Sequence, residues 1–282
     1  MALPDLSPGL WALGIAAALL VGISKTGVPG AGILVVPLLA RIFGARLSVG
    51  TMLPMLIFGD CFAVAWYRRH TRWDKLWGLF PSVSIGVAAG ALLLQILGKA
   101  PANKDYLNVL IGALVLSMLA VHLARVRFGE RISLQSRAGL LATGSIAGFS
   151  TTVSNAAGPV MGIYLTSLKL PKEQFMGTTA WYFFIVNVAK FPILAALSFA
   201  NPGNLIVSAS SLTFNLAMAP VILLGVFVGK WMLPRISQRA FDSVVLVLAA
   251  IAAINLIHPL TPGKPAAPHA APATAIHGSM RR

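Results

Sequence analysis

The sequence predicts an all-α polytopic membrane protein, and three observations carry that prediction. Of its 282 residues, 57% are hydrophobic and 10% are charged, whereas soluble domains carry about 25% charged residues. Apolar runs long enough to cross a bilayer core of about 30 Å recur along nearly the whole chain. Two of these runs are interrupted by glycine and polar residues and resemble each other, which indicates an internal duplication.

The uninterrupted runs each have about the 20 residues that one crossing needs. They cover residues 47–67, 76–98, 106–126, 175–199, 212–234 and 240–257. The interrupted regions cover residues 10–43 and 138–168. The start MALPDLSPGLWALG lacks the basic n-region of a secretory signal, so we expect it to be the mature N-terminus. The Pro/Ala-rich tail, residues 259–282, is expected to be disordered.

The two interrupted regions align with each other along the chain. GISKTGVPGAGILVVPLL from Gly22 matches GFSTTVSNAAGPVMGIYL from Gly148, an offset of 126. At an offset of 127, VGTMLPMLIFGD matches MGTTAWYFFIVN and pairs Asp60 with Asn187. We therefore expect two homologous halves, residues 1–127 and 128–258, each with an interrupted region followed by three spans. Broken segments at corresponding positions of two halves point to the binding site of a secondary transporter.

The length of each interrupted region favours a hairpin over a simple span. A continuous helix over residues 10–43 would be about 51 Å long, far more than one crossing needs. Split at SKTGVPG, its arms 10–23 and 31–43 are each about 20 Å and too short to cross alone. In the second region, arms 138–152 and 156–168 on either side of VSN are also too short to cross alone. Both regions are expected to be re-entrant, with tips near the middle of the membrane.

Loop charges favour the same topology over the alternative of eight simple spans. Simple spans would place 11 basic residues on one side and 9 on the other. Hairpins give each half three crossings and opposite orientation, and the counts without the tail become 12 against 4. That asymmetry fits the positive-inside rule and predicts that both termini are non-cytoplasmic. The 12 basic residues predicted on the cytoplasmic side are Arg68, Arg69, Arg72, Lys75, Arg125, Arg127, Arg131, Arg137, Lys169, Lys172, Arg235 and Arg239. The four predicted on the other side are Arg41, Arg46, Lys99 and Lys104.

The breaks offer the chemistry of an anion site. A helix that begins after each break, at Ala31 and Ala156, presents free N–H groups and the positive end of its dipole. Glycines let a ligand approach the backbone, and hydroxyl, amide and ammonium groups add donors. A lysine beside a break is otherwise expected to pair with a carboxylate or to extend to water. The predicted substrate-binding set is Ser24, Lys25, Thr26, Gly27, Gly30, Gly32, Thr51, Thr152, Ser154, Asn155, Gly158 and Thr178.

Three deep polar residues form a second predicted set, for ion coupling. Asp60 is the acid inside a plain span, and its equivalent in the second half is the uncharged Asn187. Lys190 follows Asn187 by three residues and shares its helical face. A pair of Asp60 with Lys190 or Lys25 is one interpretation, and a proton carried by Asp60 is the other. The glycine pairs in GVAAG and GVFVG, residues 86–90 and 225–229, are interpreted as helix-packing positions.

The paired repeats, each followed by a Gly-Thr helix, resemble the TauE/SafE family of sulfite and sulfonate transporters. The resemblance covers roughly residues 10–258 and implies a permease of the bacterial inner membrane. It implies a substrate such as sulfite, sulfoacetate or a related organosulfonate, in many members exported and driven by an H⁺ or Na⁺ gradient. The SKTG of Ser24 to Gly27 departs from the more glycine-rich motif of many members, which leaves the substrate open.

Other classes of function are weighed against this one. An anion channel of the same architecture, or a transporter of a small carboxylate, remains open. An intramembrane hydrolase using Ser24 and Lys25 is not expected, because neighbouring helical side chains point about 100° apart. The net charge of +15 is ascribed to basic membrane loops and not to nucleic acid. We expect no metal site, no cofactor and no enzyme activity; membrane lipid is a partner, and a homodimer is left open.

Overall fold

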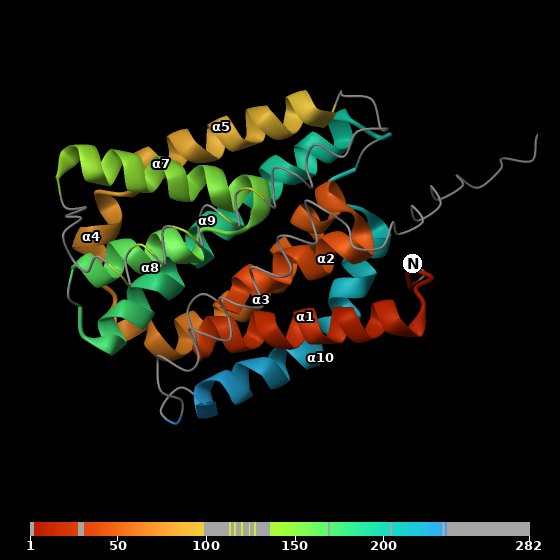
Figure 1. Ribbon diagram of the computed structural model, residues 1–282, viewed down its shortest axis with the longest axis horizontal. Coiled ribbons are helices and arrows are strands. Elements are labelled where there is room, and N and C mark those ends of the chain that lie inside the picture. Colours follow the sequence, from red (N-terminus) through yellow and green to blue (C-terminus); the bar gives the residue numbers. More distant parts are fainter. Residues whose placement is uncertain are drawn as a thin grey trace, which may run out of the picture.

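The chain is built from helices, and its computed structural model describes residues 3–27, 31–98, 136–168, 170–203 and 205–232 with a few isolated positions (Figure 1). No strand occurs in these ranges. Two 3-10 segments are η1 (Ala31–Leu34) and η2 (Arg68–His70). The α-helices are α1 (Pro8–Thr26), α2 (Val35–Phe43), α3 (Ala45–Tyr67), α4 (Trp73–Trp77), α5 (Phe80–Gly98), α7 (Arg137–Ser154), α8 (Gly158–Ser167), α9 (Lys172–Ala200) and α10 (Ala209–Met232).

Five of the described helices, α1, α3, α5, α9 and α10, are long and apolar enough to cross a membrane. The spans predicted at 47–67, 175–199 and 212–234 correspond to α3, α9 and α10. The span predicted at 76–98 begins at Phe80 instead, because Gly78 follows the short α4 and Pro81 favours a new helix start. The spans predicted at 106–126 and 240–257, and the tail, lie outside the described residues apart from scattered positions.

The first interrupted region turns back on itself. The ring of Phe214, in α10, lies 5.6 Å from the ring of Trp11 near the start of α1. The same ring lies 5.0 Å from that of Phe43 at the end of α2. Because both ends of the region meet one residue, α1 and α2 form a hairpin, and α2 is seen to run back beside α1 and α3 (Figure 1).

The second interrupted region also turns back. Ser82, at the start of α5, donates a hydrogen bond to the carbonyl of Leu140 near the start of α7. Tyr164, near the end of α8, donates to the carbonyl of Lys75, just before α5. Both arms of this hairpin therefore meet the short stretch from Lys75 to Ser82, at the start of α5. The two interrupted regions form helical hairpins as expected, and the prediction that their tips lie near the middle of the membrane stays a prediction.

The two hairpins run in opposite directions. α1 lies parallel to α10, with Gly14 against Phe214 and Gly27 against Gly229. α7 lies parallel to α5, which runs opposite to α3. α3 and α9 are antiparallel, since Gly177 near the start of α9 lies against Tyr67 at the end of α3, and Asp60 meets Asn187 farther along both helices. The first hairpin thus packs on a helix of the second half and the second hairpin on a helix of the first half.

The first arm of each hairpin is longer than predicted. Ser7 and Ser136 cap α1 and α7, where their side chains accept hydrogen bonds from the backbone N–H groups of Leu10 and Gly139. The helices therefore begin two residues and one residue before the predicted arms, and α1 also continues to Thr26. At 19 residues α1 is long enough to cross a membrane, so the prediction that this arm is too short to cross alone is wrong.

The helices that follow the breaks also differ from the prediction at their starts. At Ala31 the chain first forms η1, and the α-helix begins at Val35. α8 begins at Gly158 and not at Ala156, because Asn155 adopts a left-handed conformation with φ of 54° that ends α7. The N–H of Ala156 then reaches back to the carbonyl of Ser150 and closes the turn.

Glycines bring the parallel helix pairs into backbone contact. A Cβ added at Gly22 would lie closer than 3.0 Å to the backbone of Ile222 and Val226 in α10. A Cβ added at Gly148 would lie as close to the backbone of Val83 and Val87 in α5. The glycine pair of 86–90 lies on the face of α5 that contacts α7, and the pair of 225–229 lies on the face of α10 that contacts α1. Both positions support their interpretation as packing residues.

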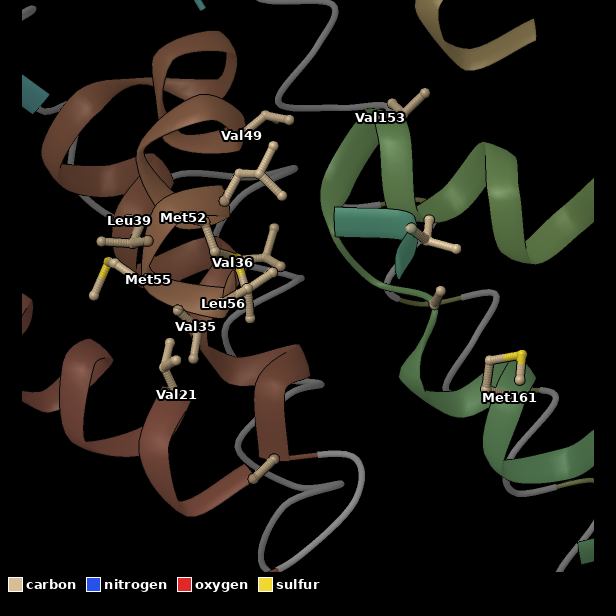
Figure 2. Packing of buried hydrophobic residues seen from close by; sticks show 14 of the residues in the cluster. Val21, Val35, Val36, Leu39, Val49, Met52, Met55, Leu56, Val153 and Met161 are labelled. Carbon is tan, nitrogen blue, oxygen red and sulfur yellow. The ribbon is translucent and has the colours of Figure 1, made fainter. Parts of the chain in front are cut away.

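The buried core lies between the hairpins and α3. Figure 2 shows Val35, Leu39 and Met55 on the side of the first hairpin, with Val153 and Met161 on the side of the second. The outer faces of α5 and α10 are also apolar, with Leu92 and Leu224 each 58% exposed. Such apolar outer faces are expected of helices that contact lipid.

Gly22→Ala is expected to destabilise the protein by about 1–3 kcal/mol, because the new methyl group would meet the backbone of α10 and force the helices apart. Thermal unfolding in detergent measures the change. Gly9→Ala is the matched control in the same helix, since nothing lies within 4 Å of its added Cβ. Equal unfolding midpoints for the two variants would contradict the close contact of α1 with α10.

Candidate anion-binding site

A buried ion pair joins the first break to the middle of α3. The ammonium of Lys25, in the last turn of α1, lies 2.7 Å from Oδ1 of Asp60. The Lys25 side chain is 9% exposed and that of Asp60 is fully buried. The Lys25 ammonium also lies 4.6 Å from the centre of the Phe183 ring. Two charges removed from water in this way depend strongly on each other.

The other oxygen of Asp60 faces its counterpart in the second half. Nδ2 of Asn187 donates to Oδ2 of Asp60 at 2.7 Å, and both residues are fully buried. The sequence offset of 127 pairs these two residues, so their hydrogen bond lies where the equivalent helices α3 and α9 cross. The Oδ1 atom of Asn187 is buried and has no hydrogen-bond partner.

A second buried lysine holds the second break. The ammonium of Lys190, in α9, donates to the carbonyl and the hydroxyl of Thr151, both at 2.8 Å, and to Oδ1 of Asn155 at 2.9 Å. Its three N–H donors are thus matched by three neutral acceptors. This cation lies at the C-terminal end of α7, where the negative end of the helix dipole stabilises it. Asn155 in turn donates to the carbonyl of Val49 in α3 at 2.8 Å, so the break is tied to both long helices.

A cavity of about 60 Å³ lies between the two breaks and the long helices α3 and α9. At roughly 10–15 Å³ for each water, this volume corresponds to about four to six waters, so the cavity is sized for a small ligand. Its lining is mainly apolar with a few polar groups, as is typical of small-molecule sites. The lining residues are Ser24, Lys25, Gly32, Met52, Leu56, Asp60, Ala63, Thr151, Asn155, Ala156, Gly158, Gly162, Phe175, Met176, Thr179, Ala180 and Phe183.

The lining follows the internal repeat. Equivalent residues of the two halves occur on it as the pairs Lys25/Thr151, Gly32/Gly158, Met52/Thr179 and Leu56/Phe183. The backbone around the cavity is therefore nearly symmetric, whereas its charges are not. Lys25 and Asp60 are the two charged groups on the lining, and the ammonium of Lys25 is the group that could bind a small anion.

The predicted substrate-binding residues divide into two groups in the structure. Ser24, Lys25, Gly32, Asn155 and Gly158 line the cavity, and Asp60 of the coupling set lines it too. Six others do not line the cavity and make helix-packing or local contacts instead. Thr26 donates a hydrogen bond to the carbonyl of Val226, Gly27 packs on Gly229, and Thr152 packs on Gly90. Thr51 and Ser154 donate to carbonyls of their own helices, and Thr178 accepts from the N–H of Arg72. Gly30 lies outside the described residues.

Thr179 and Phe183 were missed by the sequence reasoning. Thr179 lies eight residues and Phe183 four residues before Asn187, so both share its helical face. Extending that face toward the start of α9 would have found them. The Thr179 hydroxyl is buried at the cavity and has no hydrogen-bond partner, which makes it an available donor.

Comparison with known proteins gives one match. The model of the family described as sulfite exporter TauE/SafE matches residues 14–256, which include the second hairpin, the first hairpin except the first six residues of α1, and every described residue of the cavity. Neither the curated proteins nor the solved structures gave a match.

Lys190→Met is expected to destabilise the protein by about 1–3 kcal/mol, because it leaves the acceptors of Thr151 and Asn155 without their donor. The unfolding midpoint in detergent measures it. Lys230→Met is the control, since Lys230 is exposed and lies over the Trp66 ring, a contact worth about 1 kcal/mol or less. A larger loss for Lys230→Met would contradict the role given to Lys190.

Proposed function

The chain belongs to the TauE/SafE sulfite exporter family, and from that membership and the geometry of the cavity we propose that it is a secondary transporter of small sulfur oxyanions or organosulfonates. Export by alternating access, coupled to an ion gradient, completes the proposal. The observation that carries it is the cavity between two broken helices, which is lined by the ion pair of Lys25 and Asp60.

The chemistry of the lining supports a sulfonate-type ligand. Lys25 supplies a charge for the anionic group, and the Thr179 hydroxyl supplies a further donor. Phe175, Phe183 and Met52 offer apolar surface for a short organic part of the substrate. A small inorganic oxyanion would use the polar groups alone, so sulfite and a short sulfonate both belong to the proposed class.

The arrangement of the hairpins supports alternating access. Each hairpin enters the bundle from a different end and contributes its break to the same cavity. If one hairpin and its partner helix rock against α3 and α9, the cavity opens toward one end of the bundle while the other end stays closed. Transporters built from inverted repeats work in this way around a fixed central site.

The placement in the cell is also part of the proposal. The multi-pass helices and the family support a membrane location, and we infer the inner membrane. The basic loop between α3 and α5, with Arg68, Arg69, Arg72 and Lys75, is inferred to face the cytoplasm. The N-terminus would then face the opposite side, as would the C-terminus.

In proteoliposomes, unlabelled sulfite or sulfoacetate trapped inside is expected to drive counterflow of the labelled anion. A screen of sulfite, thiosulfate, sulfate, taurine, sulfoacetate and aliphatic carboxylates by thermal shift identifies the ligand, because a bound anion raises stability by mass action. Purely electrodiffusive anion current without counterflow would contradict a carrier. Stabilisation by carboxylates alone would contradict the substrate class.

Lys25→Ala is expected to weaken anion binding at least tenfold, because it removes the cation that lines the cavity. Lys75→Ala is the matched control, since Lys75 lies outside the cavity beside the exposed Asp74 and is expected to keep wild-type affinity. Titration of the purified variants with the anion identified by the screen measures both. Unchanged affinity in Lys25→Ala would place the binding site elsewhere.

A further inference from the structure

Lys25 already has an anionic partner inside the protein. Its ammonium lies 2.7 Å from the Asp60 carboxylate, and both groups border the cavity. Lys190 cannot take its place as a direct ligand, because its three donors are bound by Thr151 and Asn155. An anion that binds Lys25 therefore competes with Asp60 for the same ammonium.

Displacement would leave Asp60 as a buried carboxylate without its cation. Removing one partner of a buried pair is strongly unfavourable, because the remaining charge is uncompensated. Uptake of one proton by Asp60 removes that charge. The competition for Lys25 and the protonation of Asp60 are therefore coupled through the same ion pair.

Asn187 is able to serve both protonation states of Asp60. In the structure its Nδ2 donates to the carboxylate, and its Oδ1 is buried without a partner. A protonated Asp60 carries an O–H donor, and rotation of the Asn187 amide by 180° would present Oδ1 as its acceptor. A carboxylate or a leucine at position 187 could not act in both ways.

We propose that the substrate anion displaces Asp60 from Lys25 and that Asp60 takes one proton from water in the same step, so that anion and proton cross together. This inference rests on the proposed transport function. The O–H bond forms on Asp60, the ammonium of Lys25 keeps its three hydrogens, and the anion becomes its partner. When the cavity opens toward the other side of the membrane, the anion and the proton are both released, and the ion pair of Lys25 with Asp60 forms again.

The charge of the site supports this exchange. The charged groups that act on Asp60 are Lys25 of α1 and Lys190 of α9. With Asp60 ionised and no ligand, Lys25 and Asp60 sum to zero. With Asp60 protonated and a monovalent anion bound to Lys25, the sum is again zero. The loaded and empty carriers thus have the same charge, and in export the outward anion gradient must exceed any proton gradient directed into the cell.

Binding of sulfite and of methanesulfonate to the wild type and to Asp60→Asn, measured from pH 5 to 9, tests the exchange. Asparagine imitates the protonated carboxyl group, so the variant is expected to bind anions without taking up a proton. The ratio of wild-type to variant Kd cancels the titration of the ligand itself. That ratio is expected to rise about tenfold per pH unit above the titration of Asp60. A ratio independent of pH overturns the proposal.

Asp74→Asn is the matched control, because hydrogen bonds from Arg72 lower the pKa of the exposed Asp74 to about 2 and it stays ionised throughout this range. Its Kd ratio to the wild type is expected to stay constant. Proton uptake by the wild type in weak buffer gives a second measurement that needs no variant. Close to one proton per bound methanesulfonate supports the proposal, and none overturns it. If neither anion binds the wild type, the proposed function itself fails.

Discussion

A break in a membrane helix leaves backbone groups that must find partners inside the protein, and this constraint shapes the centre of the molecule. The carbonyl of Thr26, at the end of α1, accepts from the Tyr67 hydroxyl, and that of Thr151, in the last turn of α7, accepts from Lys190. Each of these donors comes from α3 or α9. The long antiparallel pair is therefore both the scaffold on which the hairpins rest and the source of the polar groups at their tips.

The two halves share a backbone plan but divide the chemistry between them. Lys25 stands where the second half has Thr151, and Asp60 where it has Asn187. Lys190 stands where the first half has Ala63. The differences at these three positions place the ion pair of Lys25 with Asp60 at the first break, and Lys190 with its three neutral acceptors at the second.

The sequence allowed the fold to be predicted further than the site. Glycine and polar residues inside apolar runs located both breaks, and run length with loop charge favoured hairpins over spans. The shift of 126 to 127 residues between the two halves could not show that α1 packs on α10 and α7 on α5. A repeat in the sequence identifies which helices are equivalent, but not which helices are neighbours. The earlier starts of α1 and α7 depend on the caps Ser7 and Ser136, which apolar patterns do not record.

Within the site, sequence placed Lys25 and Asp60 at similar depth but could not choose the partner of either. Lysine side chains are long enough to reach several acceptors, and only the packing of α7 against α9 brings Lys190 to Thr151 and Asn155. Thr26 and Thr152 were predicted to bind substrate because they lie at the breaks. The helix contacts with Gly229 and Gly90 decide instead that they face neighbouring helices.

The central claim is that the two breaks enclose one anion site beside Lys25. Anomalous diffraction from crystals grown with 2-bromoethanesulfonate tests it most directly, because the bromine marks the ligand independently of the protein density. We expect one bromine peak between the hairpins, beside Phe183, with the sulfonate within hydrogen-bond distance of the Lys25 ammonium. A bound sulfonate away from both breaks, with the ion pair of Lys25 and Asp60 intact, would contradict it.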